Sequence, residues 1–138
     1  MPAPPFALRG LDHVVLRVRD VARMRTFYCD VLGATLEREQ PELGLTQLRV
    51  GASLIDLITV DGKLGRAGGV APASTGRNVD HICLGITTYD EEVLRAYLHA
   101  QGVAAGEAGS RYGAEGEGPS LYLSDPEGNG IELKGPVR

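Results

Sequence analysis

The sequence contains an internal repeat, and this feature limits the possible folds more than any other. Residues 11–18 read LDHVVLRV and residues 79–86 read VDHICLGI, with Asp, His and Leu identical in register. A second match aligns residues 55–57 with 131–133, in the same order along the chain. Two ordered matches indicate two copies of one supersecondary unit. Each copy has only about sixty residues, so the copies must pair to form a core, within one chain or across a dimer.

The first copy predicts a strand, a helix and three more strands. Residues 11–18 alternate between faces and are rich in β-branched side chains, which is typical of a strand. Asp20 suits a helix N-cap, apolar residues follow at helical spacing, and Gly33 suits the C-terminal end of the helix. The remaining strands are predicted over residues 34–39, 45–50 and 53–60.

The second copy predicts the same order of elements. Residues 78–87 form the first strand, and a capping box of Thr88 and Glu91 begins a helix that ends at Gly102. A short strand is expected near Val103, and further strands over residues 121–124 and 130–134, joined by a turn at 125–130. The glycine-rich residues 106–118 are expected to form a long loop, either a lid over a site or a floppy surface loop.

The predicted architecture is therefore α+β, with two tandem β-α-β-β-β modules in one domain of residues 1–138. The modules span residues 9–60 and 78–136, and residues 61–77 link them. The net charge of −4 and the lack of a basic patch argue against nucleic acid and acidic membrane surfaces as partners. No apolar run reaches the ~20 residues of a membrane span. With only two cysteines and no signal peptide, we expect a cytoplasmic protein.

Four polar side chains are predicted on the sheet faces that point away from the helices. Along each strand the aliphatic residues take the helix side, which leaves His13, Asp56, His81 and Glu132 on the other side. Packing gives no reason for two imidazoles and two carboxylates at symmetric positions. Such a set suits a divalent metal ion, although each His could also be structural, and Asp56 is as easily a bystander as a site residue.

Each of the other side chains on these faces has two possible roles. Arg17 lies on the His13 side, where it would bind an anionic substrate group or stand solvated at the rim. Tyr122 is a candidate for substrate contact, with core packing as the alternative. Cys83 shares the His81 face, and the simpler interpretation is that it packs there as a small apolar side chain.

Several motifs resemble those of the vicinal oxygen chelate superfamily, also called the glyoxalase/bleomycin-resistance/dioxygenase group. The motifs are Leu11-Asp12-His13-Val14, the predicted helix segment FYCDVLG at 27–33, Asp80-His81 and DPEGNGIEL at 125–133. The resemblance extends from about Leu8 to Pro136. It implies a cupped, half-open barrel, commonly dimeric, with a divalent metal inside.

The resemblance also implies roles for individual residues. The family's metal ligands map onto His13, His81 and Glu132, and Asp56 occupies the position where glyoxalase I-like members have a glutamate. Asp is one methylene shorter, so Asp56 would reach the metal only through water, act as a base, or do neither. We expect one ion of Zn, Ni, Co, Mn or Fe and a homodimer.

The function expected from these residues is a metal-dependent lyase or isomerase acting on a small molecule with vicinal oxygens. Glu132 or Asp56 would transfer the proton, and Arg17 and Tyr122 would contact the substrate. Three alternatives stay open. They are an extradiol-type ring-cleaving dioxygenase, an enzyme of epoxide-antibiotic resistance, and a metal-free, bleomycin-type binding protein.

Overall fold

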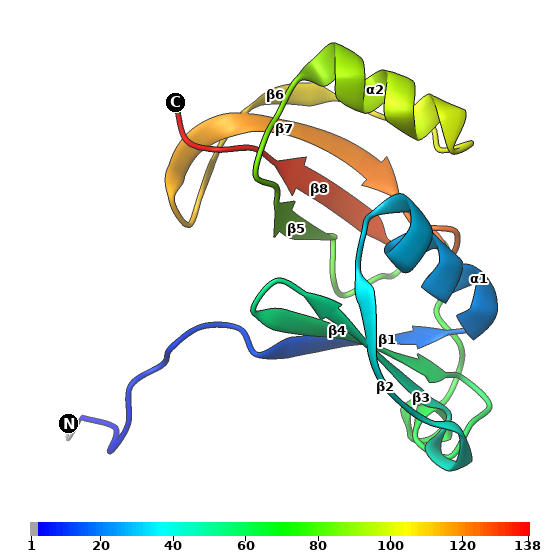
Figure 1. Cartoon of the computed structure of the whole chain (residues 1–138). Coiled ribbons are helices and arrows are strands. Elements are labelled where there is room, and N and C mark those ends of the chain that lie inside the picture. Colours follow the sequence, from blue (N-terminus) through cyan, green and yellow to red (C-terminus); the bar gives the residue numbers. More distant parts are fainter. Residues whose placement is uncertain (1–2) are drawn as a thin grey trace.

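The computed structural model describes residues 3–138 as two modules of similar build (Figure 1). The first module contains β1 (His13–Val18), α1 (Val21–Thr26), a π-helical turn (Phe27–Val31), β2 (Thr35–Gln40), β3 (Leu45–Val50) and β4 (Ser53–Thr59). The second contains β5 (His81–Gly85), α2 (Glu91–Ala100), β6 (Ala108–Gly113), β7 (Gly116–Ser124) and β8 (Gly130–Lys134). The predicted α+β fold with a repeated β-α-β-β-β order is confirmed.

Each module has one four-stranded sheet with the same topology. The strand orders are β1-β4-β3-β2 and β5-β8-β7-β6, so the first strand of each module forms a sheet edge. That edge strand runs parallel to the last strand of its module, and the other pairs are antiparallel. The two sheets stay separate and do not close into a barrel, as Figure 1 shows.

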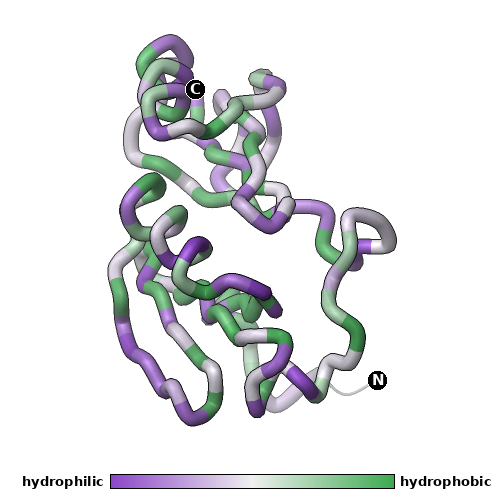
Figure 2. The backbone as a smooth tube through the Cα atoms, turned by 90° about the vertical axis from the view of Figure 1, so that its right-hand side faces the viewer, coloured by the Kyte–Doolittle hydropathy of each residue, from purple (hydrophilic) through white to green (hydrophobic). Residues whose placement is uncertain are grey.

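The strands have one buried face and one open face. Figure 2 shows hydrophobic and hydrophilic stretches interspersed along the whole chain. In β1, Leu16 and Val18 are buried while His13 and Val15 are exposed, as the alternation predicts. In β8, Ile131 and Leu133 belong to the hydrophobic core. Glu132, which lies between them, therefore lies on the opposite face of the sheet.

Helix α1 begins where the sequence predicts. The carboxylate of Asp20 accepts a hydrogen bond from the Arg23 backbone N–H at 3.0 Å, which caps the helix. The chain then widens into the π-helical turn and leaves it through Gly33, whose φ of +84° is accessible to glycine. This turn buries Phe27 and Tyr28 in the core.

The turn between β7 and β8 joins the two modules. The Tyr28 hydroxyl, from the first module, donates to Asp125 Oδ2 at 2.7 Å inside the protein. The carboxylate of Glu127 accepts from the backbone N–H groups of Arg19 and Asp20 at 2.8 to 2.9 Å. Figure 1 shows α1 beside this turn. The predicted turn is confirmed, and its side chains hold α1 against the second module.

Three boundaries in the second module differ from the prediction. The N-cap of α2 is Asp90, which accepts from the Val93 N–H at 3.2 Å, so a capping box at Thr88 is wrong. Residues 106–118 form most of a β-hairpin, because β6 pairs with β7 along six residues. The loop or lid expected there, and the strand near Val103, are therefore wrong. None of the helices in residues 3–138 is long and apolar enough to cross a membrane.

Candidate functional site

The first module brings His13 and Asp56 to the open face of its sheet. His13 begins β1, and Asp56 lies on the neighbouring β4, paired with Val15. Asp56 is only 4% exposed, and Gln47 Nε2 donates to its Oδ2 at 3.1 Å. Its other oxygen, Oδ1, is buried without a hydrogen-bond partner among the described residues. A buried carboxylate oxygen without a donor is costly, so this atom is available to a further group.

The second module brings His81 and Glu132 into direct contact. His81 begins β5, and Glu132 lies on the neighbouring β8, paired with Cys83. The Nε2 atom of His81 lies 3.1 Å from Glu132 Oε1. Glu132 is 5% exposed, so its carboxylate is held inside the protein next to the imidazole. The two modules thus carry equivalent pairs of one histidine and one carboxylate.

Both histidines are oriented by the aspartate that precedes them. His13 Nδ1 lies 2.6 Å from Asp12 Oδ1, and His81 Nδ1 lies 2.8 Å from Asp80 Oδ2. The hydrogen bond with Asp12 raises the pKa of His13 and lowers the pKa of Asp12. When a neutral imidazole donates through Nδ1 to the aspartate, its Nε2 has a lone pair, which is the usual arrangement for a metal-binding histidine. At His81 this lone pair would face Glu132 Oε1 at 3.1 Å, so a proton or a cation must lie between the two atoms. Neither aspartate was predicted to have a role, although the Asp-His pair that recurs in both copies of the repeat was a signal for one.

The His81–Glu132 pair has ionisable neighbours. The Tyr122 ring meets the His81 ring edge-on at 5.3 Å between centroids, and the Arg111 guanidinium carbon lies 4.4 Å from the Tyr122 centroid. Burial and the adjacent Glu132 raise the pKa of Cys83 to about 11 and also raise the pKa of Tyr122. The thiol and the phenol therefore stay protonated near neutral pH.

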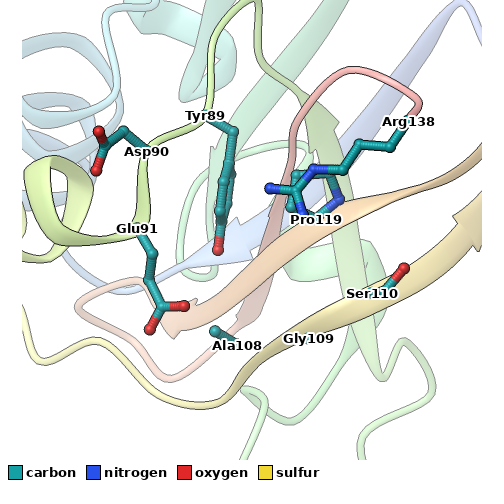
Figure 3. Close-up of a pocket in the computed structure, with 8 residues that line it drawn as sticks. All are labelled: Tyr89, Asp90, Glu91, Ala108, Gly109, Ser110, Pro119 and Arg138. Carbon is teal, nitrogen blue, oxygen red and sulfur yellow. The ribbon is translucent and has the colours of Figure 1, made fainter.

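Two cavities are lined by these groups, and a third lies away from them. A cavity of about 340 Å³ on the open face of the second sheet is lined by His81, Cys83 and Glu132, among others. A largely apolar cavity of about 450 Å³ runs between the edges β1 and β5 and touches both His13 and His81. The cavity in Figure 3, about 490 Å³, lies between the start of α2 and the β6–β7 hairpin. It contains none of the predicted site residues.

The four predicted metal ligands form two pairs within one chain. No group of three or more His, Cys, Asp or Glu side chains that could hold a metal occurs within residues 3–138. Arg17 donates to the carbonyl oxygens of Gly65, Gly69 and Val70 at 2.6 to 3.1 Å, so its guanidinium holds the linker. Its predicted contact with substrate stays a prediction, as does that of Tyr122.

Solved structures share this fold over nearly the whole chain. A virulence protein from Salmonella typhimurium is 26% identical with a TM-score of 0.75, and the match covers 96% of this chain and 100% of that one. A lactoylglutathione lyase from Agrobacterium tumefaciens is 18% identical with a TM-score of 0.66, covering 93% and 94%. An antibiotic-binding protein from a Streptomyces species is 23% identical with a TM-score of 0.65, covering 96% and 99%.

The sequence itself matches a family over most of its length. Residues 10–133 match the family described as the Glyoxalase/Bleomycin resistance protein/Dioxygenase superfamily. This range includes nearly all of both modules and all four predicted metal ligands. The chain belongs to the Glyoxalase/Bleomycin resistance protein/Dioxygenase superfamily.

Proposed function

We propose that this protein is a divalent-metal-dependent enzyme of the lyase or isomerase class that acts on a small molecule with vicinal oxygens. The observation that carries the proposal is the contact of His81 Nε2 with the buried Glu132 at 3.1 Å; His13 and Asp56 occupy the corresponding strand positions in the other module. A bystander role would not require equivalent pairs at equivalent positions of a repeat.

The donor atoms fit a divalent ion. The buried Oδ1 of Asp56 lacks a hydrogen-bond partner among residues 3–138, and both histidines have Nδ1 beside an aspartate. Imidazole nitrogen and carboxylate oxygen together suit Zn, Ni, Co, Mn or Fe. His13, His81 and Glu132 would hold the ion, with Asp56 as a fourth ligand or a base.

A homodimer would supply the complete site. Each chain presents two ligand pairs that do not form a group of three within the described residues, and each sheet has an unpaired edge, β1 or β5. Unpaired edges are open to another chain. We infer that the first module of one protomer faces the second module of its partner, so that each dimer has two composite sites.

The bound ion would act as a Lewis acid on the vicinal oxygens of the substrate. The protein's own residues then have separate tasks. Asp56, whose buried Oδ1 has no donor within residues 3–138, would accept the proton from the carbon next to the carbonyl group. Tyr122 stays protonated because its pKa is raised, so its hydroxyl would donate a hydrogen bond to a developing oxyanion. Burial of Asp56 and Glu132 keeps water away from both carboxylates.

Metal content is the primary test. Protein purified without chelators is analysed for metals, alongside His81→Ala and the control His99→Ala, which alters an exposed histidine in the last turn of α2. We expect near-stoichiometric metal in the wild type and in His99→Ala, and a large loss in His81→Ala. If the wild type holds no metal and takes up none of the five candidate ions, the proposal is wrong and a metal-free binding protein is favoured.

Mixing two variants tests the composite site. His13→Ala and His81→Ala each disrupt every site of their own dimers, whereas a mixed dimer would retain one intact site built from the two unaltered histidines. Random pairing should therefore restore about a quarter of the wild-type metal. No restoration after confirmed subunit exchange would place each site within one chain. Oxygen consumption with catechols separates a dioxygenase from an isomerase or lyase.

A further inference from the structure

One buried lysine near the ligand pair His81 and Glu132 has a side chain without a partner among the residues that the structure describes. Lys134 ends β8 and is 8% exposed, and its ammonium group forms no hydrogen bond or ion pair with other residues of the described range 3–138. Within residues 3–138 the one fully buried side-chain nitrogen or oxygen atom without a hydrogen-bond partner is Asp56 Oδ1, so the Lys134 ammonium still reaches the solvent and is accessible to an anion. The chain has two lysines and twelve arginines, and the other lysine, Lys63, is exposed. The buried position thus has the compact cation that the rest of the chain rarely uses.

The surrounding glycines make room for the Lys134 side chain. A Cβ atom added to Gly113 would lie 2.9 Å from Lys134 Cε, and one added to Gly118 would lie 3.1 Å from Nζ. Gly85 pairs with Lys134 across β5 and β8, and a Cβ added there would meet nothing within 4 Å. The side chain therefore passes over two glycines, with open space on its other side.

The lysine shares a cavity with His81 and Glu132. The cavity of about 340 Å³ is lined by all three residues and continues to Glu115 on the β6–β7 hairpin. No carboxylate oxygen of Glu132 or Glu115 lies within 4.0 Å of the Lys134 Nζ atom, so neither glutamate forms an ion pair with the lysine. Lys134 and Glu132 are two residues apart on β8, which is about 6.6 Å along a strand.

The direction of the side chain separates the ammonium from the ligand pair. Across the β7–β8 ladder, Tyr122 stands opposite Glu132 and Ser120 stands opposite Lys134. The Nζ atom approaches Gly118, which lies two residues beyond Ser120 on the side away from Tyr122. The cavity thus has a ligand pair at one end and a cation at the other.

We propose that Lys134 binds an anionic group of the substrate, a phosphate or carboxylate roughly 7 Å or more from the atoms that Glu132 contacts. This inference rests on the proposed function and specifies its substrate class, a vicinal-oxygen compound with a remote anionic group. Lysine binds either anion as a point charge. Such a substrate would extend along the cavity, with its reacting end at His81 and Glu132.

The test observes the lysines directly. Protein with isotope-labelled lysine gives two lysine side-chain signals in NMR spectra, and a Lys63→Arg variant assigns them. Metal is removed with EDTA so that no paramagnetic ion broadens the signals. The probes are glycerol 3-phosphate and 3,4-dihydroxybutanoate, which carry vicinal hydroxyls and a remote anion, and glycerol as the uncharged control. We expect the Lys134 signal to shift saturably with both anions and to ignore glycerol, while Lys63 stays unchanged.

Two variants examine the cause of the binding. Lys134→Met should weaken binding of glycerol 3-phosphate at least about tenfold in calorimetry, whereas Lys63→Met should leave it unchanged. Gly113→Ala keeps all charges but displaces the lysine stem, so it should also weaken binding. Thermal unfolding checks that each variant is folded.

The outcomes separate this inference from the proposed function. A Lys134 signal that moves with neither anion, or no more than Lys63, would overturn the inference, even if the protein contains stoichiometric metal. A saturable Lys134 shift in a protein that never binds metal would support the anion site and reject the metal-dependent enzyme. Metal content of Lys134→Met should equal that of the wild type, because the lysine is not a ligand.

Discussion

Replacing Tyr28 with Phe removes a single hydroxyl from the contact between the modules. The hydroxyl donates to Asp125 Oδ2 at 2.7 Å, and Tyr28 is 1% exposed. The buried carboxylate keeps three donors from the turn, the backbone N–H groups of Glu127 and Asn129 and the Asn129 side-chain amide. A hydrogen bond to a charged group contributes about 1.5–3 kcal/mol, so we expect a loss of about 2 kcal/mol in the free energy of unfolding. The melting temperature should fall by roughly 7 °C for a chain of this size.

The measurement is urea unfolding, with Tyr97→Phe as the matched control. The Tyr97 hydroxyl donates to the Val31 carbonyl at 2.7 Å and also joins the modules, but Tyr97 is 42% exposed. Water can replace the lost bond there, so we expect a loss of at most about 1 kcal/mol. If Tyr28→Phe costs no more than Tyr97→Phe at an unchanged m value, burial does not determine the strength of this contact and the reasoning is refuted.

Three more predictions concern single side chains. Burial raises the pKa of Cys83 to about 11, so roughly one thiol in a thousand is ionised at pH 8. The rate of Cys83 alkylation, followed by peptide mass spectrometry, should therefore rise about tenfold per pH unit towards pH 11. Glu132→Gln removes the charge that helps to raise this pKa and should increase the rate at pH 8; an unchanged rate would contradict the assigned cause. Gly44→Ala should lower the free energy of unfolding by about 1–3 kcal/mol in urea, because φ is +67° and the new Cβ would lie 2.6 Å from Thr59 Oγ1. An unchanged free energy would show that Thr59 rotates away and that the backbone strain is negligible. Asp56→Asn should raise the free energy of unfolding of the EDTA-treated protein by roughly 1 kcal/mol, seen as a higher urea midpoint at an unchanged m value, since it removes a buried charge whose Oδ1 has no partner among the described residues; a lower midpoint would mean that Gln47 already compensates that charge.

The repeat and the alternation of apolar residues were sufficient to predict most of the fold. The predicted strands at 45–50 and 130–134 coincide with β3 and β8, because a one-residue shift would turn every apolar side chain to the open face. The same alternation predicted which residues face away from the helices. It follows that His13 and Glu132 were assignable to the open face without knowledge of the tertiary structure.

The remaining features depend on contacts between segments distant in the sequence. Residues 106–118 are rich in glycine and have low β propensity, but pairing with β7 makes them a hairpin. The contact of Tyr28 with Asp125 joins different modules, so no local pattern contains it. Lys134 looks like an ordinary surface lysine at the end of a strand until Gly113 and Gly118 are found beneath its side chain. Such arrangements become visible only when the strands are placed side by side.

The two copies of the repeat differ in a way that separates shared chemistry from specificity. At the equivalent positions of both open faces stand His13 and His81, each after an aspartate, and these suit a task that both modules perform together. Two residues beyond the carboxylate, the first copy has Ile58 where the second has Lys134. A ligand held at the symmetric positions would therefore meet an apolar residue on one side and a cation on the other. A substrate with one charged end and one uncharged end could bind such a site in only one direction, and that direction decides which of its carbons lies beside Asp56.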